Sequence, residues 1–167
     1  MNRLLKKKAI IPLFILTILF QVILLINTYY QAAPDEFKMF VSEIQTKAFY
    51  QAIAVIVLVV TLVFLVVSIY IFALISNLIA NYLFNFNLMF NLTFKVIIIY
   101  MFFATLGVLV FHILINNDYS LLFYLNPFVF IGSAIVYVII QSEVKARIRP
   151  LIFVGLIYIA TIILLNI

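Results

Sequence analysis

Few side chains in this sequence could do chemistry, and their spacing matches no known catalytic arrangement. The chain has 167 residues, no cysteine and one histidine, His112. The absence of cysteine excludes thiolate catalysis and cysteine-ligated metal sites. A single histidine without a carboxylate cluster makes a poor metal site, so we interpret His112 as a packed or interfacial residue. The sequence also lacks the HExxH, GxSxG, P-loop and GxGxxG motifs. We therefore predict no enzyme activity, no metal and no cofactor.

The composition limits where such a chain can exist. Hydrophobic residues make up 69% of it and charged residues 9%, and the mean hydropathy is +1.37. A soluble domain carries about a quarter charged residues, so this chain cannot build a water-facing surface. Its net charge of +5 comes from short clusters and not from a continuous basic face, which argues against nucleic acid as a partner. We predict an all-α, polytopic membrane helical bundle that contacts lipids and other membrane proteins.

Stretches without charge predict the membrane-spanning helices. A helix needs about 20 residues to cross a hydrocarbon core of about 30 Å. The charge pattern then predicts one membrane domain over residues 1–167 with five spans, at 9–27, 50–75, 96–115, 126–143 and 150–167. The first apolar run is longer than a signal-peptide core of about 7–15 residues, so we expect this helix to be retained.

The orientation follows from the 47-residue charge-free stretch 48–94. If it crosses once and the N-terminus is inside, eight of the ten Lys and Arg lie on the cytoplasmic side; if it crosses twice, only four do. The positive-inside rule favours one crossing, with the N-terminus cytoplasmic and the C-terminus outside. The chain is rich in Ile, Phe, Asn, Tyr and Lys, as is typical of AT-rich bacterial genomes. We therefore expect a multi-pass protein of a bacterial plasma membrane.

The outer loop 28–49 contains a pattern typical of a short amphipathic helix. Pro34, Asp35 and Glu36 suit a helix start, because proline presets φ and carboxylates favour the positive end of the helix dipole. Apolar residues then recur at a spacing of three to four, at Phe37, Phe40, Val41 and Ile44. We predict a helix that lies on the outer surface.

The cytoplasmic segment 76–94 is the main candidate for a contact site. Asn77, Asn81 and Asn85 recur every four residues, so in a helix they would share one face. Amides on one face are costly in lipid, so this helix either extends the second span or lies on the cytoplasmic leaflet. It is then either a plain surface helix or a docking site for another subunit or for lipid.

Two further features concern the last two spans. Lys145, Arg147 and Arg149 form a basic turn, which either only fixes the topology or also contacts anionic lipid or an acidic partner. Asn126 and Pro127 suit the N-cap and first residue of the fourth span. A kinked helix from Leu121 is the competing interpretation.

Small residues within the predicted spans indicate where helices can approach closely. They are Ser68, Ser76, Thr105, Gly107, Gly132, Ser133, Ala134, Gly155 and Ala160.

From about residue 50 onward, the order of features resembles that of bacterial Yip1-domain proteins. An apolar helix runs into an aromatic and Asn-rich stretch, and a span led by Lys95 follows. Leu125-Asn126-Pro127-Phe128 opens the next helix, and the basic hairpin from Lys145 to Arg149 leads to the terminal span. The resemblance implies a helical membrane protein without enzymatic activity, and it supplies no catalytic residues. Bacterial relatives often accompany ABC-type exporters, including exporters that handle antimicrobial peptides.

The function that we expect is that of a non-enzymatic accessory subunit in a membrane complex. The complex would be an ABC-type exporter or an antimicrobial-peptide resistance or immunity system. The alternative is a stand-alone small transporter or lipid-handling protein, which would need a polar cavity lined by Asn and Ser side chains.

Overall fold

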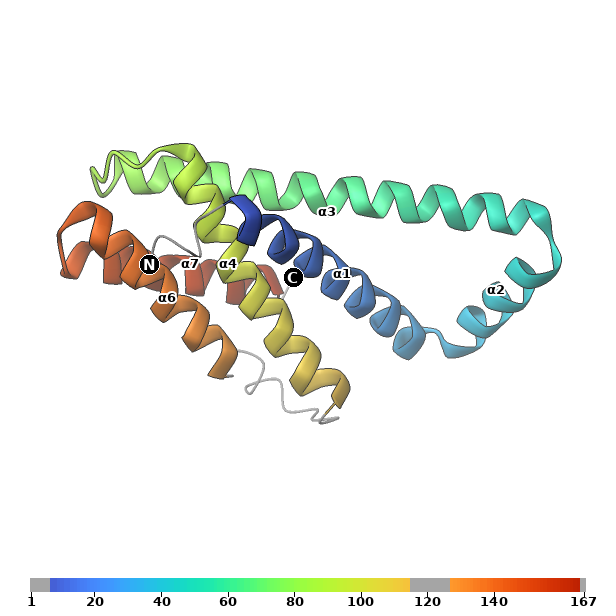
Figure 1. Cartoon of the computed structure of the whole chain (residues 1–167). Helices are drawn as coiled ribbons and strands as arrows, with labels where there is room; N and C mark the ends of the chain where they lie inside the picture. Colours follow the sequence, from blue (N-terminus) through green and yellow to red (C-terminus); the bar gives the residue numbers. More distant parts are fainter. Residues whose placement is uncertain (1–6, 115–126, 166–167) are drawn as a thin grey trace.

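The computed structural model describes the backbone of residues 7–114 and 127–165 and the side chains of residues 9–111 and 127–161. These residues are almost entirely helical and contain no β-strand, which confirms the all-α prediction. The helices in Figure 1 are α1 (Lys7–Ala32), α2 (Pro34–Thr46), α3 (Ala48–Tyr82), α4 (Phe90–Val108), the π-helical turn η1 (Leu109–Leu114), α6 (Pro127–Val144) and α7 (Ile148–Leu165).

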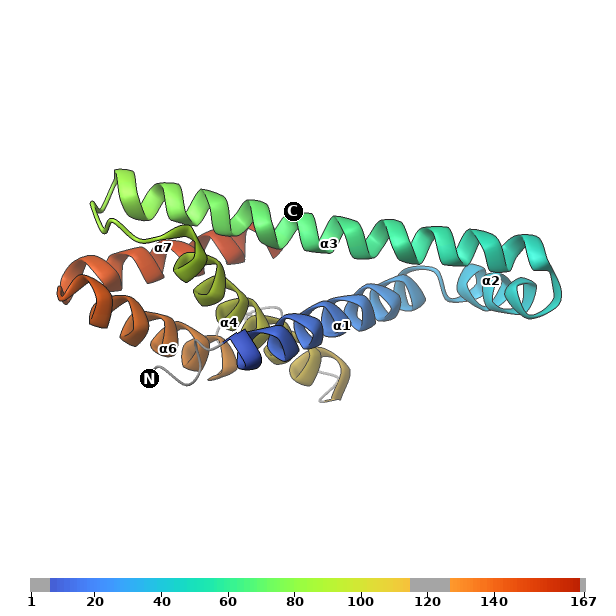
Figure 2. The same cartoon turned by 45° about the horizontal axis from the view of Figure 1, so that its top comes forward.

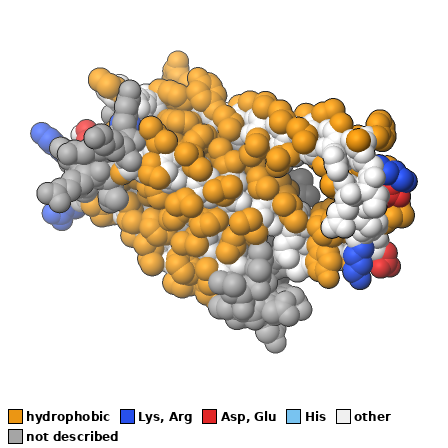
Figure 3. Space-filling view, turned by 45° about the vertical axis from the view of Figure 1, so that its right-hand side comes forward, with side chains coloured by type: hydrophobic (Ala, Val, Ile, Leu, Met, Phe, Trp, Pro, Cys, Tyr) orange, Lys and Arg blue, Asp and Glu red, His pale blue; other side chains and the backbone are white. Residues whose placement is uncertain are grey.

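Four of the described helices are long and apolar enough to cross a membrane, so the chain has the features of a multi-pass membrane protein. The four segments are Ala9–Ala32, Ala48–Tyr82, Phe90–Phe111 and Pro127–Val144. The described apolar part of α7, Ile148–Thr161, is shorter, and the fifth crossing stays a prediction. In Figure 3, hydrophobic side chains cover the middle of the visible face and charged side chains lie toward its two ends.

The segment 76–94 is not one helix. Its first part extends α3 to Tyr82, its last part belongs to α4 from Phe90, and a turn separates the two. Of the two predicted placements, the structure therefore favours extension of the second span for residues 76–82. Helix α4 begins at Phe90, six residues before the predicted start of the third span at residue 96. A lysine stem such as that of Lys95 can lie along apolar surface, so its charge does not have to mark a helix end.

The predicted helix start at Pro34 agrees with the structure. Helix α2 has Pro34 in its first turn with Asp35 and Glu36, and none of its residues is fully buried, as expected for a surface helix. The described part of α6 begins at Pro127. Asn126, the predicted N-cap, and Leu121, the alternative start, lie outside the described residues.

Aromatic contacts fix α2 to the end of α1. The ring of Phe37 packs edge-on against Tyr29 and Tyr30, with centroids 5.8 and 5.5 Å away. Such pairs contribute about 0.5–1.5 kcal/mol beyond the area they bury. Figures 1 and 2 show that α2 connects the separated ends of α1 and α3.

The other end of α2 is joined to α3 by polar contacts at an elbow around Lys47. The Lys47 ammonium pairs with Glu43, and the Gln51 amide donates a hydrogen bond of 3.0 Å to the Ile44 carbonyl. The hydrogen bond and the negative charge of Glu43 raise the pKa of Lys47, so the Lys47 ammonium stays charged at neutral pH. Helix α2 is therefore held at both ends and acts as a strut between α1 and α3.

Helix α4 lies at the centre of the bundle. Its residues Val96–Tyr100 are all buried, and a helix that is buried on every side must have neighbours on every side. Phe14 of α1 packs against Phe94 at a centroid distance of 6.2 Å, and Phe20 packs against Phe102 at 5.8 Å. The residue further along α1 contacts the residue further along α4, so the two helices run parallel.

Helix α3 connects these two parallel helices and runs in the opposite direction. Tyr70, near the end of α3, packs against Phe90 and Phe94 at the start of α4, at 5.3 and 6.2 Å. Helices α3 and α4 therefore form an antiparallel hairpin. The stretch 48–94 contains a single long helix before its turn, as the one-crossing interpretation requires.

Helices α4 and α6 approach each other closely at Gly132. A Cβ atom built on Gly132 would lie 2.8 Å from Cβ of Phe103, closer than real Cβ atoms come. At Gly155 in α7, nothing lies within 4 Å of such an atom. The prediction that small residues mark close packing therefore holds for Gly132 and is wrong for Gly155.

We predict that Gly132→Ala destabilises the bundle by about 1–3 kcal/mol, because α4 and α6 must move apart to admit the methyl group. Gly155→Ala is the matched control, and it should be neutral or slightly stabilising, because alanine favours helix over glycine. Thermal unfolding in detergent measures both. Equal effects of the two substitutions would contradict the assigned contact.

Candidate functional site

Two of the three predicted asparagines form a clasp with the turn between α3 and α4. The Asn81 side chain pairs with both backbone groups of Leu88: its Oδ1 accepts from the Leu88 N–H at 2.8 Å, and its Nδ2 donates to the Leu88 carbonyl at 3.0 Å. Asn77 Nδ2 also donates to the Leu88 carbonyl, at 3.1 Å, and to the Thr93 hydroxyl at 2.8 Å. We call Asn77, Asn81, Leu88 and Thr93 the asparagine clasp.

The clasp pairs backbone groups that would otherwise be buried without a hydrogen-bond partner. Leu88 and Thr93 are buried, and an unpaired backbone group at a buried position costs about 1–3 kcal/mol. At the edges of the turn 83–89, Leu83 N–H still donates to the Ile79 carbonyl at 3.0 Å and the Met89 carbonyl accepts from Leu92 and Thr93, but Leu88 lies outside both helices. Phe86 N–H donates to the Ala80 carbonyl at 3.1 Å, and the clasp satisfies Leu88. The asparagine side chains thus replace the missing helical partners.

Asn85, the third predicted asparagine, has a different role. It lies in the turn with a φ of 53°, and Asn87 has a φ of 52°. Asparagine tolerates this left-handed region better than most residues, which explains why an Asn-Phe-Asn sequence can make a turn without glycine. Asn85 is exposed and does not share a face with Asn77 and Asn81. The single amide face predicted from the four-residue spacing is therefore wrong.

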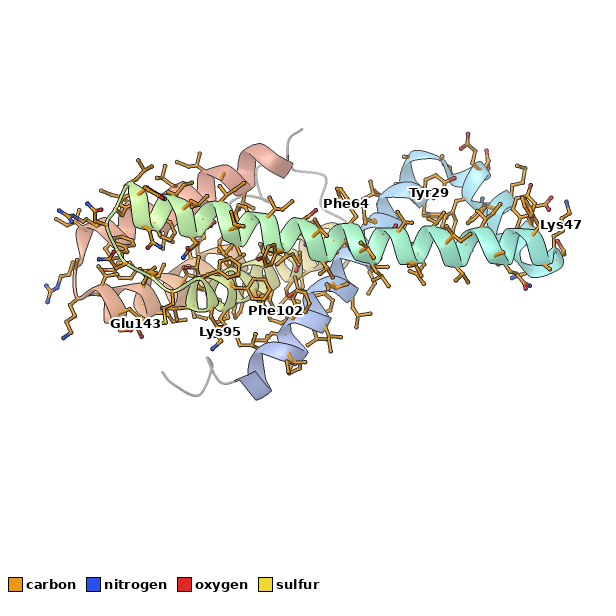
Figure 4. All side chains as sticks on the ribbon, turned by 90° about the horizontal axis from the view of Figure 1, so that it is seen from above. Tyr29, Lys47, Phe64, Lys95, Phe102 and Glu143 are labelled. Carbon is orange, nitrogen blue, oxygen red and sulfur yellow. The ribbon has the colours of Figure 1, made fainter. Side chains whose placement is uncertain are left out.

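The turn and the basic hairpin lie at the same end of the molecule. Phe84 and Phe86 both pack against Phe153 near the start of α7, with centroids 5.7 Å apart in each pair. The basic hairpin just before α7 is thereby brought next to the turn. Lys145, Arg147 and Arg149 are all exposed there. Figure 4 shows Lys95 and Glu143 toward this end and Lys47 at the opposite end.

The two predicted contact sites therefore share one end but differ in what they offer. The Asn77 and Asn81 amides are engaged within the chain, whereas the Lys145, Arg147 and Arg149 side chains face outward. Exposed apolar side chains lie at the same end, at Tyr82, Leu83, Met89 and Ile148. This end can offer a mixed basic and apolar surface to lipid headgroups or to a partner protein.

Within the described residues, no three His, Cys, Asp or Glu side chains come together as a metal site. His112 lies in η1, and its side chain is outside the described set. Two further polar side chains in α1, Gln21 and Asn27, each have one buried atom without a hydrogen-bond partner among the described residues, and neither was predicted as a candidate because neither is ionisable. For Gln21, an amide within the otherwise apolar run of residues 18–26 was the available signal.

No family model, no characterised protein and no solved structure matches this chain.

We predict that Asn81→Leu lowers the stability of the protein by about 1–3 kcal/mol or more, because it leaves the buried Leu88 N–H without an acceptor. Asn91→Leu is a matched control at an exposed position in the first turn of α4, and it should change stability by less than about 0.5 kcal/mol. Thermal unfolding in detergent compares the two variants. If Asn81→Leu left the stability unchanged and Asn91→Leu lowered it, the clasp would not be what holds the turn.

Proposed function

We propose that this chain is a non-enzymatic, multi-pass subunit of a larger complex in a bacterial plasma membrane. The observation that carries the proposal is the isolation of the middle of α3. From Val55 to Val67, none of its residues is buried, and only Thr61, Leu62 and Leu65 are half-buried. Only 6% of the most apolar window of α3 is buried within the chain, against 44% for α4.

The burial of α3 differs between its first and second halves, and this difference supports a partner for the first half. Near its end, Ile69, Ala73, Ser76 and Ala80 form a buried stripe. Small residues at this spacing are how membrane helices approach each other. The isolated segment 55–67 has no such stripe and is held away from α1 by the α2 strut. A strut fixed at both ends keeps this face open, as a docking surface for another transmembrane helix requires.

The kind of partner rests on the Yip1-domain resemblance. It favours an ABC-type exporter or a system for antimicrobial-peptide resistance or immunity, with this chain as the accessory subunit. Contact would be made within the membrane through residues 55–67 of α3 and at the proposed cytoplasmic end through Lys145, Arg147 and Arg149. No step of this role needs a catalytic residue.

A stand-alone transporter with a cavity lined by Asn and Ser receives less support. A cavity between α1, α3, α4 and α7 is lined mainly by apolar side chains, and none of its lining residues is Asn or Ser. Asn77 and Asn81 instead bind the chain's own backbone.

We predict that a photo-crosslinking aromatic residue at Phe64, which is 68% exposed, couples this chain to one transmembrane protein in the native host. The same residue at Phe130 on α6, which is 51% exposed, is the matched control and should give mainly lipid adducts. Mass spectrometry identifies the products, and an ABC-type permease is the expected partner. Lipid adducts alone at both positions, or a product formed only between two copies of this chain, would contradict the proposal.

We further predict that Phe64→Ala weakens co-purification with the partner without changing the melting temperature of the isolated chain. The physical reason is that an exposed side chain without internal contacts costs the fold less than about 0.5 kcal/mol when it is removed. Quantitative co-purification and thermal unfolding measure the two effects. A lower melting temperature with unchanged co-purification would show that Phe64 serves the fold and not an interface.

A further inference from the structure

Two shallow hollows adjoin where the end of α1 meets α2. The first, of about 440 Å³, is lined by Ile23, Ile26, Asn27 and Tyr30 of α1 and by Phe37 of α2. The second, of about 230 Å³, is lined by Tyr30 and Phe37 again and by Lys38, Val41, Ser42 and Gln45 of α2. The rings of Tyr30 and Phe37, with centroids 5.5 Å apart, therefore belong to both hollows. We call the two hollows together the α1–α2 groove.

The polarity of the groove changes along its length. Its α1 part is formed by the exposed side chains of Ile23 and Ile26, and the Nδ2 atom of Asn27 is buried, so a ligand in the groove cannot reach it. From Ile23 to Tyr30 the helix rises about 10 Å, which is about a third of a hydrocarbon core. The part on α2 instead offers the Lys38 ammonium and the Gln45 amide. The groove is thus apolar toward the middle of α1 and polar beside the surface helix α2, as a phospholipid is along its own length.

The charges of α2 are arranged so that the groove side carries the cation. The α2 residues that line the groove recur at spacings of three to four and share one face of the helix. Glu36 and Glu43, seven residues apart, lie on the opposite face, and Glu43 pairs with Lys47. Asp35 lies closer to the groove side, but Lys38 makes no ion pair with it or with any other described residue. The exposed Lys38 ammonium is therefore available to an anion in the groove.

We propose that the α1–α2 groove binds one glycerophospholipid of the leaflet beside α2, with its phosphate on the Lys38 ammonium and one acyl chain along Ile23 and Ile26. The Gln45 amide can donate a second hydrogen bond to the phosphate. Inorganic phosphate would contact only the α2 part of the groove and a hydrocarbon only the α1 part, whereas a phospholipid matches both. The site is independent of the proposed docking surface at residues 55–67 of α3.

The test uses the purified full chain in dodecyl maltoside, a detergent without phosphate, with a trace of phosphatidylglycerol that carries a diazirine in one acyl chain. Mass spectrometry locates the photo-adducts, which we expect on Ile23 and Ile26 more often than on Phe130, an exposed residue of α6. Two unlabelled competitors then isolate the phosphate: phosphatidylglycerol has it, and diacylglycerol with the same acyl chains lacks it. Phosphatidylglycerol should suppress the adducts on Ile23 and Ile26 at a concentration about fivefold lower, which corresponds to about 1 kcal/mol for one lysine at a lipid headgroup.

Lys38→Gln should abolish this fivefold difference and leave suppression by diacylglycerol unchanged, because it removes only the charge that meets the phosphate. Lys145→Gln, at an exposed lysine of the basic hairpin, is the matched control and should keep the difference. If Lys38→Gln does not fold, the wild-type comparison still decides. Equal suppression by the two lipids in the wild-type chain, an unchanged difference in Lys38→Gln, or adducts as frequent on Phe130 as on Ile23 and Ile26 would overturn the proposal.

Discussion

The fold depends on the requirement that buried backbone groups be paired where water is scarce. Within α1, α3, α4, α6 and α7, helical hydrogen bonds pair the backbone groups. The turn between α3 and α4 is where this requirement is hardest to meet. Asn81 meets it by pairing both backbone groups of Leu88, and Asn77 adds a second donor to the same carbonyl. The turn can therefore bury Phe86 and Leu88, and α4 can start directly beside the end of α3.

The other features follow from this hairpin. Once α3 and α4 are antiparallel, α1 can pack parallel to α4, and α2 has to connect the far ends of α1 and α3. The aromatic contacts of Phe37 and the Lys47–Glu43 pair make α2 a rigid connection. The result is a packed end around α4 and an open end along α3. The proposed partner surface belongs to the open end.

Local signals predicted the helices well and the turn poorly. Pro34 marks a helix start because proline acts on its own backbone, so no tertiary contact is needed to foresee its effect. The prediction for Asn85 is wrong because a four-residue spacing is typical of a helix. The left-handed φ of Asn85 depends instead on the clasp that Asn77 and Asn81 make with Leu88. Leu88 is close to these residues in sequence but lies outside their helix. Gly132 and Gly155 look alike in sequence, and only the approach of Phe103 distinguishes them.

The most direct test of this account uses single cysteines, since the chain has none of its own. Cysteines at Phe49, Met89 and Ile148, all exposed, are labelled in intact cells with a reagent that does not cross the membrane, and again after lysis. If α3 crosses once and turns at the clasp, position 49 reacts from outside, and positions 89 and 148 react only after lysis. Labelling of positions 49 and 89 from the same side would contradict a single crossing by α3.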